Sequence, residues 1–130
     1  MNTNSCVLTQ TGRAAILCLA ALVSAGVSHG QMLPSTQVKT LTASAKTSAD
    51  HMKLAKHYEA VAARHEEEAK QHDALAEQYT KHPTGHEQKH PMSGQTAAHC
   101  KYYADHCRKA AESARGIAAG HAEMAKQNGK

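Results

Sequence analysis

The chain of 130 residues contains no Phe and no Trp, and its only aromatic side chains besides His are four Tyr. Large aliphatic side chains are also rare after residue 30. Because hydrophobic stabilisation scales with buried apolar area, a small domain of this composition is only marginally stable alone. We therefore expect a homo-oligomer, most simply a dimer of helical hairpins that forms a four-helix bundle.

Acidic residues are absent before Asp50, and Arg13 precedes an apolar run from Ala14 to Val27 that only Ser24 interrupts. A positive flank followed by such a run is typical of a secretory signal peptide, and the run is too short to span a bilayer comfortably. We predict a signal peptide over residues 1–30, cleaved before Gln31. The mature protein is then periplasmic or secreted, with no membrane span after cleavage.

Cysteine is scarce once the signal peptide is removed, because only Cys100 and Cys107 remain. Seven residues of helix rise about 10.5 Å, which is farther than one disulfide bridges. In an oxidising compartment these thiols would pair between chains, bind a metal, or stay buried as small hydrophobic groups.

Several functional signatures are missing. There is no basic cluster interleaved with aromatic residues, so we expect no nucleic-acid partner. There is also no Gly-rich phosphate loop and no nucleophile elbow, and no enzymatic activity is expected. The segment from His86 to His90 matches the H-E-x-x-H pattern of zinc peptidases. Pro83, Gly85 and Pro91 surround it, however, which predicts a loop rather than the helix that this chemistry requires.

Alanine recurs every seventh residue in two segments, and this is the strongest pattern in the chain. The two alanine columns are Ala55, Ala62, Ala69 and Ala76, and Ala104, Ala111, Ala118 and Ala125. The pattern predicts an all-α fold, an antiparallel two-helix hairpin with close backbone contact. We expect a flexible Ser/Thr-rich leader over 31–47, a helix over about 48–81, a loop over 83–95 and a helix over about 96–127. Thr47 or Ser48 and Thr96 are the predicted N-caps.

Beside the alanines, a seam of larger residues gives a register for the hairpin. Pairing residues whose numbers sum to 178 or 179 produces the layers Leu54–Met124, Tyr58–His121, Val61–Ile117, His65–Ala114, Glu68–Ala110, His72–Cys107, Leu75–Tyr103 and Tyr79–Cys100. In this register large side chains meet each other or meet alanine.

The same register gathers metal-type ligands into two groups. The seam cluster consists of His72 facing Cys107, with Glu68 one turn away and His65 a further turn along. The tip cluster, at the loop end, consists of His82, His86, His90, His99 and Cys100. Imidazole, thiolate and carboxylate groups are ligands for zinc and copper. The alternatives are register-setting polar residues in the seam and a solvated loop at the tip.

Two functions of different classes fit these patterns. The first is an exported protein that binds or buffers copper or zinc through His and Cys. The second is a structural or protein-interaction module of the cell envelope with no metal role. Ten of the eleven His lie after residue 30, so an acid-responsive envelope protein is a third hypothesis.

Overall fold

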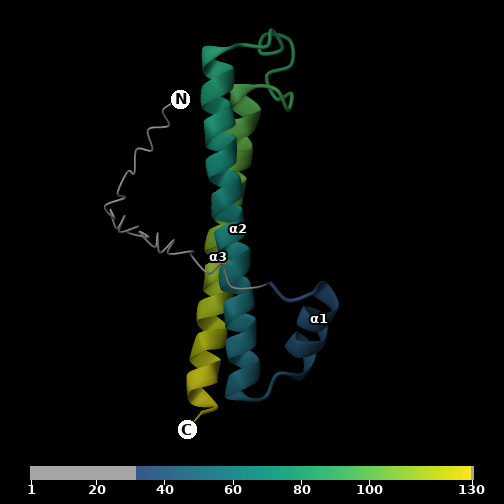
Figure 1. Ribbon diagram of the computed structural model, residues 1–130, viewed down its shortest axis with the longest axis vertical. Helices are drawn as coiled ribbons and strands as arrows, with labels where there is room; N and C mark the ends of the chain where they lie inside the picture. Colours follow the sequence, from purple (N-terminus) through teal and green to yellow (C-terminus); the bar gives the residue numbers. More distant parts are fainter. Residues whose placement is uncertain (1–31, 130) are drawn as a thin grey trace, which may run out of the picture.

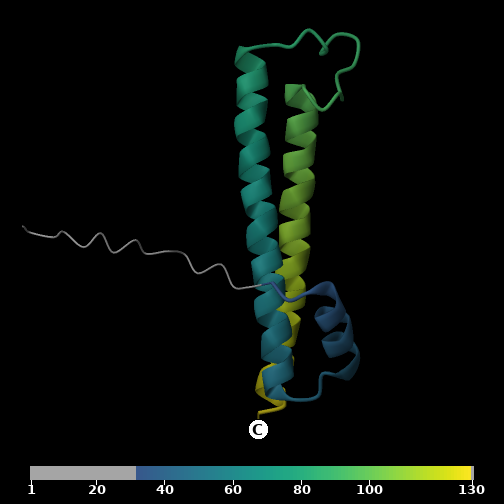
Figure 2. The same cartoon turned by 45° about the vertical axis from the view of Figure 1, so that its right-hand side comes forward.

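The computed structural model describes residues 32–129, which form three helices and no strand. α2 (Ser48–Lys81) and α3 (Ala97–Gln127) are long antiparallel helices packed along their length, and α1 (Ser35–Ser44) lies beside the lower part of α2 (Figures 1 and 2). The predicted all-α hairpin is therefore confirmed. The predicted signal peptide lies outside the described residues. None of the described helices is long and apolar enough to cross a membrane.

α2 begins at a capping box. The Thr47 side chain accepts a hydrogen bond from the Asp50 amide (3.1 Å), and the Asp50 carboxylate accepts one from the Thr47 amide (3.3 Å). Hydrogen bonds of its carboxylate with the Thr47 side chain and with the Thr47 and Lys46 amides lower the pKa of Asp50. The reciprocal pairing satisfies two backbone donors that a helix start leaves free. The helix ends at Lys81, two residues before Pro83.

The N-cap of α3 is Thr96, which is fully buried. Its hydroxyl oxygen accepts from the His99 amide (3.2 Å) and lies within hydrogen-bond distance of the Pro91 and Ser93 carbonyl oxygens. The cap thus ties the end of the loop to the first turn of the helix. Within the loop, Gly85 has a φ of 82°, a left-handed conformation that favours glycine.

The core between α2 and α3 consists mostly of alanine. All members of both alanine columns are at most 5% exposed. Ala62 packs with Ala111 and Ala114, and Ala69 packs with Ala104 and Cys107. Small side chains allow the two backbones to approach closely.

This core corrects the predicted seam. Four large residues that were expected to form buried layers are instead 37–46% exposed: Leu75, Tyr103, Ile117 and Met124. The physical reason is that the alanines themselves occupy the line of closest approach. The neighbouring heptad positions are therefore displaced toward the edges of the hairpin.

The observed register is offset from the predicted one by about one turn along the hairpin. At the open end Tyr58 stacks on His121, as predicted, with ring centroids 6.1 Å apart, but His121 also stacks on His51 at 5.4 Å and so lies between the two. Tyr103 packs on His72 (4.1 Å), where the prediction paired it with Leu75, and Cys107 contacts Glu68, where the prediction paired it with His72. The register differs from the predicted one because the alanine columns, and not the larger residues beside them, lie where the two helices are closest.

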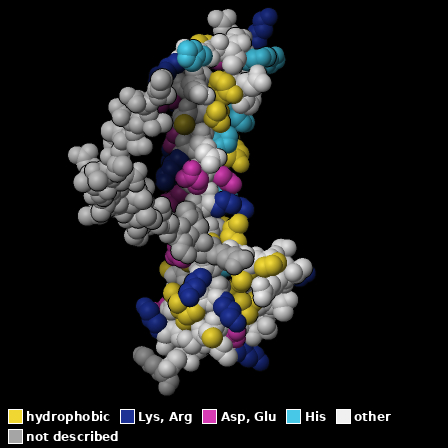
Figure 3. All heavy atoms as spheres, in the orientation of Figure 1, with side chains coloured by type: hydrophobic (Ala, Val, Ile, Leu, Met, Phe, Trp, Pro, Cys, Tyr) yellow, Lys and Arg dark blue, Asp and Glu magenta, His cyan; other side chains and the backbone are white. Residues whose placement is uncertain are grey.

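The two edges of the hairpin differ in chemistry. On one edge Arg108 pairs with Asp73 and Arg115 pairs with Glu66, each across the two helices. The opposite edge contains residues that immediately precede column alanines, because like flanking positions face each other in an antiparallel pair. We call its apolar members Leu75, Tyr103, Ala110, Ile117 and Met124 the apolar edge; Glu68 lies among them, whereas Leu54 is fully buried. In Figure 3 apolar and His side chains follow one another along the upper right-hand side of the hairpin.

The segment expected to be a flexible leader contains α1. No residue of α1 is buried, and the Thr40 and Ser44 hydroxyls donate to the backbone carbonyls four residues earlier. Just before α1, the Leu33 amide donates to Nδ1 of His57 (3.1 Å). His57 is buried, and burial lowers its pKa. α1 is therefore a short helix held on α2 by few contacts, which explains why the sequence shows little periodicity there.

Candidate metal centre

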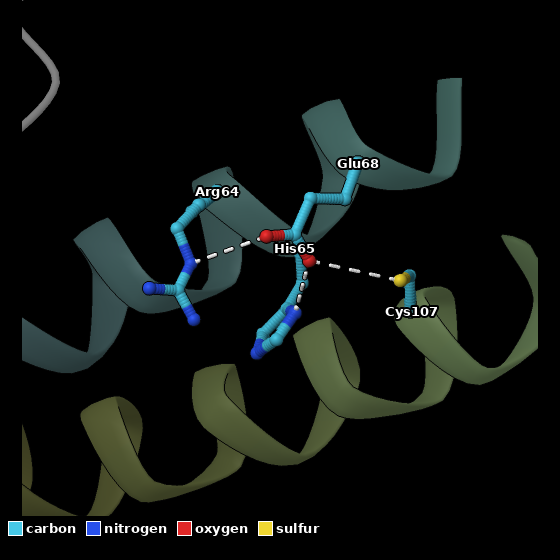
Figure 4. A network of polar contacts seen from close by, with 4 residues as sticks. All are labelled: Arg64, His65, Glu68 and Cys107. Atoms are coloured by element: carbon cyan, nitrogen blue, oxygen red, sulfur yellow. Dashed lines mark hydrogen bonds and ion pairs between the residues drawn. The ribbon is translucent and has the colours of Figure 1, made fainter. Parts of the chain in front are cut away.

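Three potential ligands from both helices meet in the middle of the hairpin. The His65, Glu68 and Cys107 ligand atoms all lie within 4.8 Å of one another. His65 Nδ1 is 3.1 Å from Glu68 Oε2, and Cys107 Sγ is 3.8 Å from the same oxygen (Figure 4). We call these three residues the seam triad. Its donors are one nitrogen, one oxygen and one sulfur atom.

Local sequence and the alanine core together place the triad. His65 and Glu68 are three residues apart, so they share a face of α2 within one turn. Cys107 stands three residues after Ala104 and shares a buried cluster with it and with Ala69. Alanine at these two positions leaves no side chain between the thiol and the α2 carboxylate.

The Cys107 thiol is held in its protonated form. It is 5% exposed, and burial raises its pKa, with the Glu68 carboxylate raising it further. The thiol therefore donates to Glu68 Oε2. The other carboxylate oxygen, Oε1, lies 3.5 Å from Arg64 Nε. A bound cation would replace the thiol proton and would place its positive charge beside a carboxylate.

His72 lies beyond the triad on α2, and its ring nitrogens are not among the ligand atoms that converge within 4.8 Å. It follows His65 by one heptad and Glu68 by one turn, and its ring packs on Tyr103. Its Nδ1 is the one buried side-chain nitrogen or oxygen between residues 32 and 129 without a hydrogen-bond partner. Buried polar atoms are normally satisfied, so this nitrogen is available to a ligand.

The structure does not bring the tip cluster together. His82, His86 and His90 are exposed, His99 is half-buried, and Cys100 is buried with its pKa raised by burial. In the described part of the chain, the seam triad is the only set of three or more His, Cys, Asp or Glu whose ligand atoms converge. The loop residues remain separate because no helix packing fixes their side chains.

The H-E-x-x-H segment lies in the loop, as predicted. Its Glu87 carboxylate accepts hydrogen bonds from the Thr84 amide (3.0 Å) and the Thr84 hydroxyl (3.3 Å). Hydrogen bonds from the backbone amide of Glu87 itself, and from the Thr84 amide and hydroxyl, lower the pKa of Glu87. The glutamate therefore organises the loop start and does not face a histidine pair on a helix.

The structure brings the predicted ligands Glu68 and Cys107 into contact, whereas the sequence pattern gave the position facing Cys107 to His72. His65 is the histidine that contacts the carboxylate. The three-residue spacing of His65 and Glu68 on one helix face was the signal that identifies this pair. Comparison of the chain with family models, with curated proteins and with solved structures gave no match.

Proposed function

We propose that the protein binds a transition-metal ion, zinc or copper, at the seam triad. The observation that carries the proposal is the convergence of His65, Glu68 and Cys107 within 4.8 Å across two helices. In a tetrahedral zinc site with bonds of about 2.0–2.3 Å, neighbouring ligand atoms are roughly 3.3–3.7 Å apart. The separations of His65 Nδ1 and Cys107 Sγ from Glu68 Oε2, 3.1 and 3.8 Å, lie close to this range.

Nitrogen, oxygen and sulfur donors together match borderline and soft metals, and they disfavour magnesium or calcium, which prefer oxygen ligands. His72, with its unsatisfied buried Nδ1, is our candidate for the fourth ligand. Binding displaces the Cys107 proton, so the affinity rises with pH. Together with the predicted signal peptide, this supports metal binding or buffering outside the cytoplasm.

A cobalt titration tests the proposal, because a thiolate bound to Co²⁺ produces a charge-transfer absorption band that nitrogen and oxygen ligands do not produce. We expect the purified protein to develop this band at one equivalent, and C107S to lose it. The variant H82A/H86A/H90A, which removes three tip histidines, is the matched control and should retain the band. A band that is absent from the wild type or that persists in C107S would refute the site.

The apolar edge supports a second candidate function, a self-associating interaction module. Ile117 and Met124 are exposed there. Gly116 and Gly120, on the same helix, have nothing within 4 Å of where a Cβ would lie. Interior helical glycines cost about 1 kcal/mol each relative to alanine, and packing within the described residues gives no reason for them.

We propose that a second copy of the chain covers this edge. Two α3 helices related by a two-fold axis pair residues whose numbers sum to 227, so that Tyr103 meets Met124 and Ala110 meets Ile117, which is self-complementary. Sedimentation equilibrium should show a dimer that I117K dissociates. A119K adds the same charge at an exposed position outside the edge and should remain dimeric. A wild-type monomer at all concentrations would exclude this assembly.

A further inference from the structure

A second pair of potential ligands meets at the open end of the hairpin, far along the helices from the seam triad. His51 lies in the first turn of α2, and His121 lies near the end of α3. Their Nδ1 atoms are 3.2 Å apart, and their rings are stacked with centroids 5.4 Å apart and an interplanar angle of 25°. Two imidazole nitrogens from different helices therefore point at one another.

We propose that His51 and His121 form a second transition-metal site, taking zinc or a similar divalent ion with water completing its coordination. Nitrogen ligands at about 2.0–2.1 Å in a tetrahedral site are about 3.3 Å apart, which matches the observed Nδ1 separation. The inference rests on the proposed function for the class of metal, but it uses none of the seam triad residues.

The surroundings of the pair favour a neutral imidazole at His121, the form that binds metals. His51 is 8% exposed, and Tyr58 covers one face of His121 with an interplanar angle of 12°. Burial lowers the pKa of His121, and the neighbouring His51 lowers it further. The nearest carboxylate in the sequence, that of Asp50, is engaged by the backbone amide of Thr47.

Without metal, the contact between the rings is a hydrogen bond in which one Nδ1–H donates to the other Nδ1. Metal binding requires the donating imidazole to move its proton from Nδ1 to Nε2, a change of tautomer that releases no proton. Both Nδ1 lone pairs then face the ion. This differs from the seam triad, where binding releases the thiol proton of Cys107.

Because of the position of the pair, a bound metal would stabilise the folded hairpin. α2 and α3 are joined covalently at the loop end, whereas their other ends meet through side chains, including a hydrogen bond from the Asn128 side chain to the Lys46 carbonyl (3.2 Å). A metal held by His51 and His121 would link the start of α2 to the end of α3. Because it binds only the folded hairpin, it raises the melting temperature.

Zinc titration of the purified protein, followed by native mass spectrometry, tests the inference. We expect two zinc ions per chain for the wild type and one per chain for H121Q. The control H106Q, which alters an exposed histidine of α3, should keep two per chain. The cobalt–thiolate band should be unchanged in H121Q. Two zinc ions bound to H121Q would overturn the inference.

A second measurement covers the case in which H121Q unfolds. Zinc should raise the melting temperature of C107S, which lacks the seam thiolate, by several degrees, and EDTA should reverse the effect. The absence of a zinc-dependent shift in C107S would overturn the second site even if the wild-type thiolate band is present. A shift in C107S without a wild-type thiolate band would instead refute the seam triad and leave the second site standing.

Discussion

The middle of the hairpin and its loop end both contain histidine and cysteine, yet only the middle brings them to metal-binding distance. In the middle, two helices in van der Waals contact through alanine fix His65, Glu68 and Cys107 within 4.8 Å. At the loop end the sequence is denser in histidine, but the side chains of His86 and His90 are exposed. Convergence of ligands therefore depends on helix register and on small core residues, not on the number of ligands in a segment.

A larger core side chain should separate the ligands in the middle of the hairpin. A104L places a bulky side chain where Ala104 is fully buried against Ala69 and Cys107. We expect a loss of about 1–3 kcal/mol in the free energy of unfolding and, because Cys107 moves away from Glu68, at least a tenfold loss of metal affinity. Urea denaturation and competitive zinc titration measure the two effects. A119L, at an exposed position of α3, is the control, and equal effects in both variants would contradict the close-packing argument.

Removing the charge of Glu68 should make the buried thiol more reactive. The carboxylate raises the pKa of Cys107, so E68Q should shift the pH profile of iodoacetamide alkylation toward lower pH. Metal affinity should fall about tenfold, because a carboxylate ligand is lost. E67Q, which removes an exposed carboxylate one residue earlier, should behave as the wild type. An unshifted alkylation profile in E68Q would mean that the carboxylate does not act on the thiol.

Acid should destabilise the open end of the hairpin. Burial lowers the pKa of His57 and of His121 in the folded protein, so the unfolded chain binds protons more readily. Their contribution to stability is complete above the unfolded pKa of about 6.5 and is lost as pH falls through the lower folded-state values. The melting temperature without metal should therefore drop between pH 7.5 and 5.

The H57Q variant should show a shallower pH dependence, whereas H82A/H86A/H90A should show the wild-type dependence because those side chains are exposed. Melting curves by circular dichroism at both pH values are sufficient. A steeper or unchanged pH dependence in H57Q would assign the effect to other groups.

The edge that carries the Arg108–Asp73 and Arg115–Glu66 ion pairs should contribute least to the stability of the hairpin. The Arg108 and Asp73 side chains are about half exposed, and surface ion pairs are typically worth about 0.2–1 kcal/mol. R108A should lower the free energy of unfolding by no more than this amount, with less effect at high salt, and should leave zinc affinity unchanged. K109A is the matched exposed control. A larger loss, or a change in zinc affinity, would show that the edge helps to set the register.

The alanine columns and the caps were sufficient to predict the hairpin and the bounds of α2 and α3. The periodicity could not predict α1, because none of its residues is buried. For the site, Glu68 and Cys107 were predicted as neighbours, but the choice between His65 and His72 depends on a register shift of one turn. Sequence pattern does not determine that shift, because alanine fits equally well in the core or beside it.

X-ray absorption spectroscopy of H121Q loaded with one equivalent of zinc tests the central claim most directly. The seam triad predicts one sulfur at about 2.3 Å together with nitrogen and oxygen ligands at about 2.0–2.2 Å. A first shell without sulfur, composed of several imidazoles, would show that the ion binds elsewhere and would contradict the assignment of the metal centre.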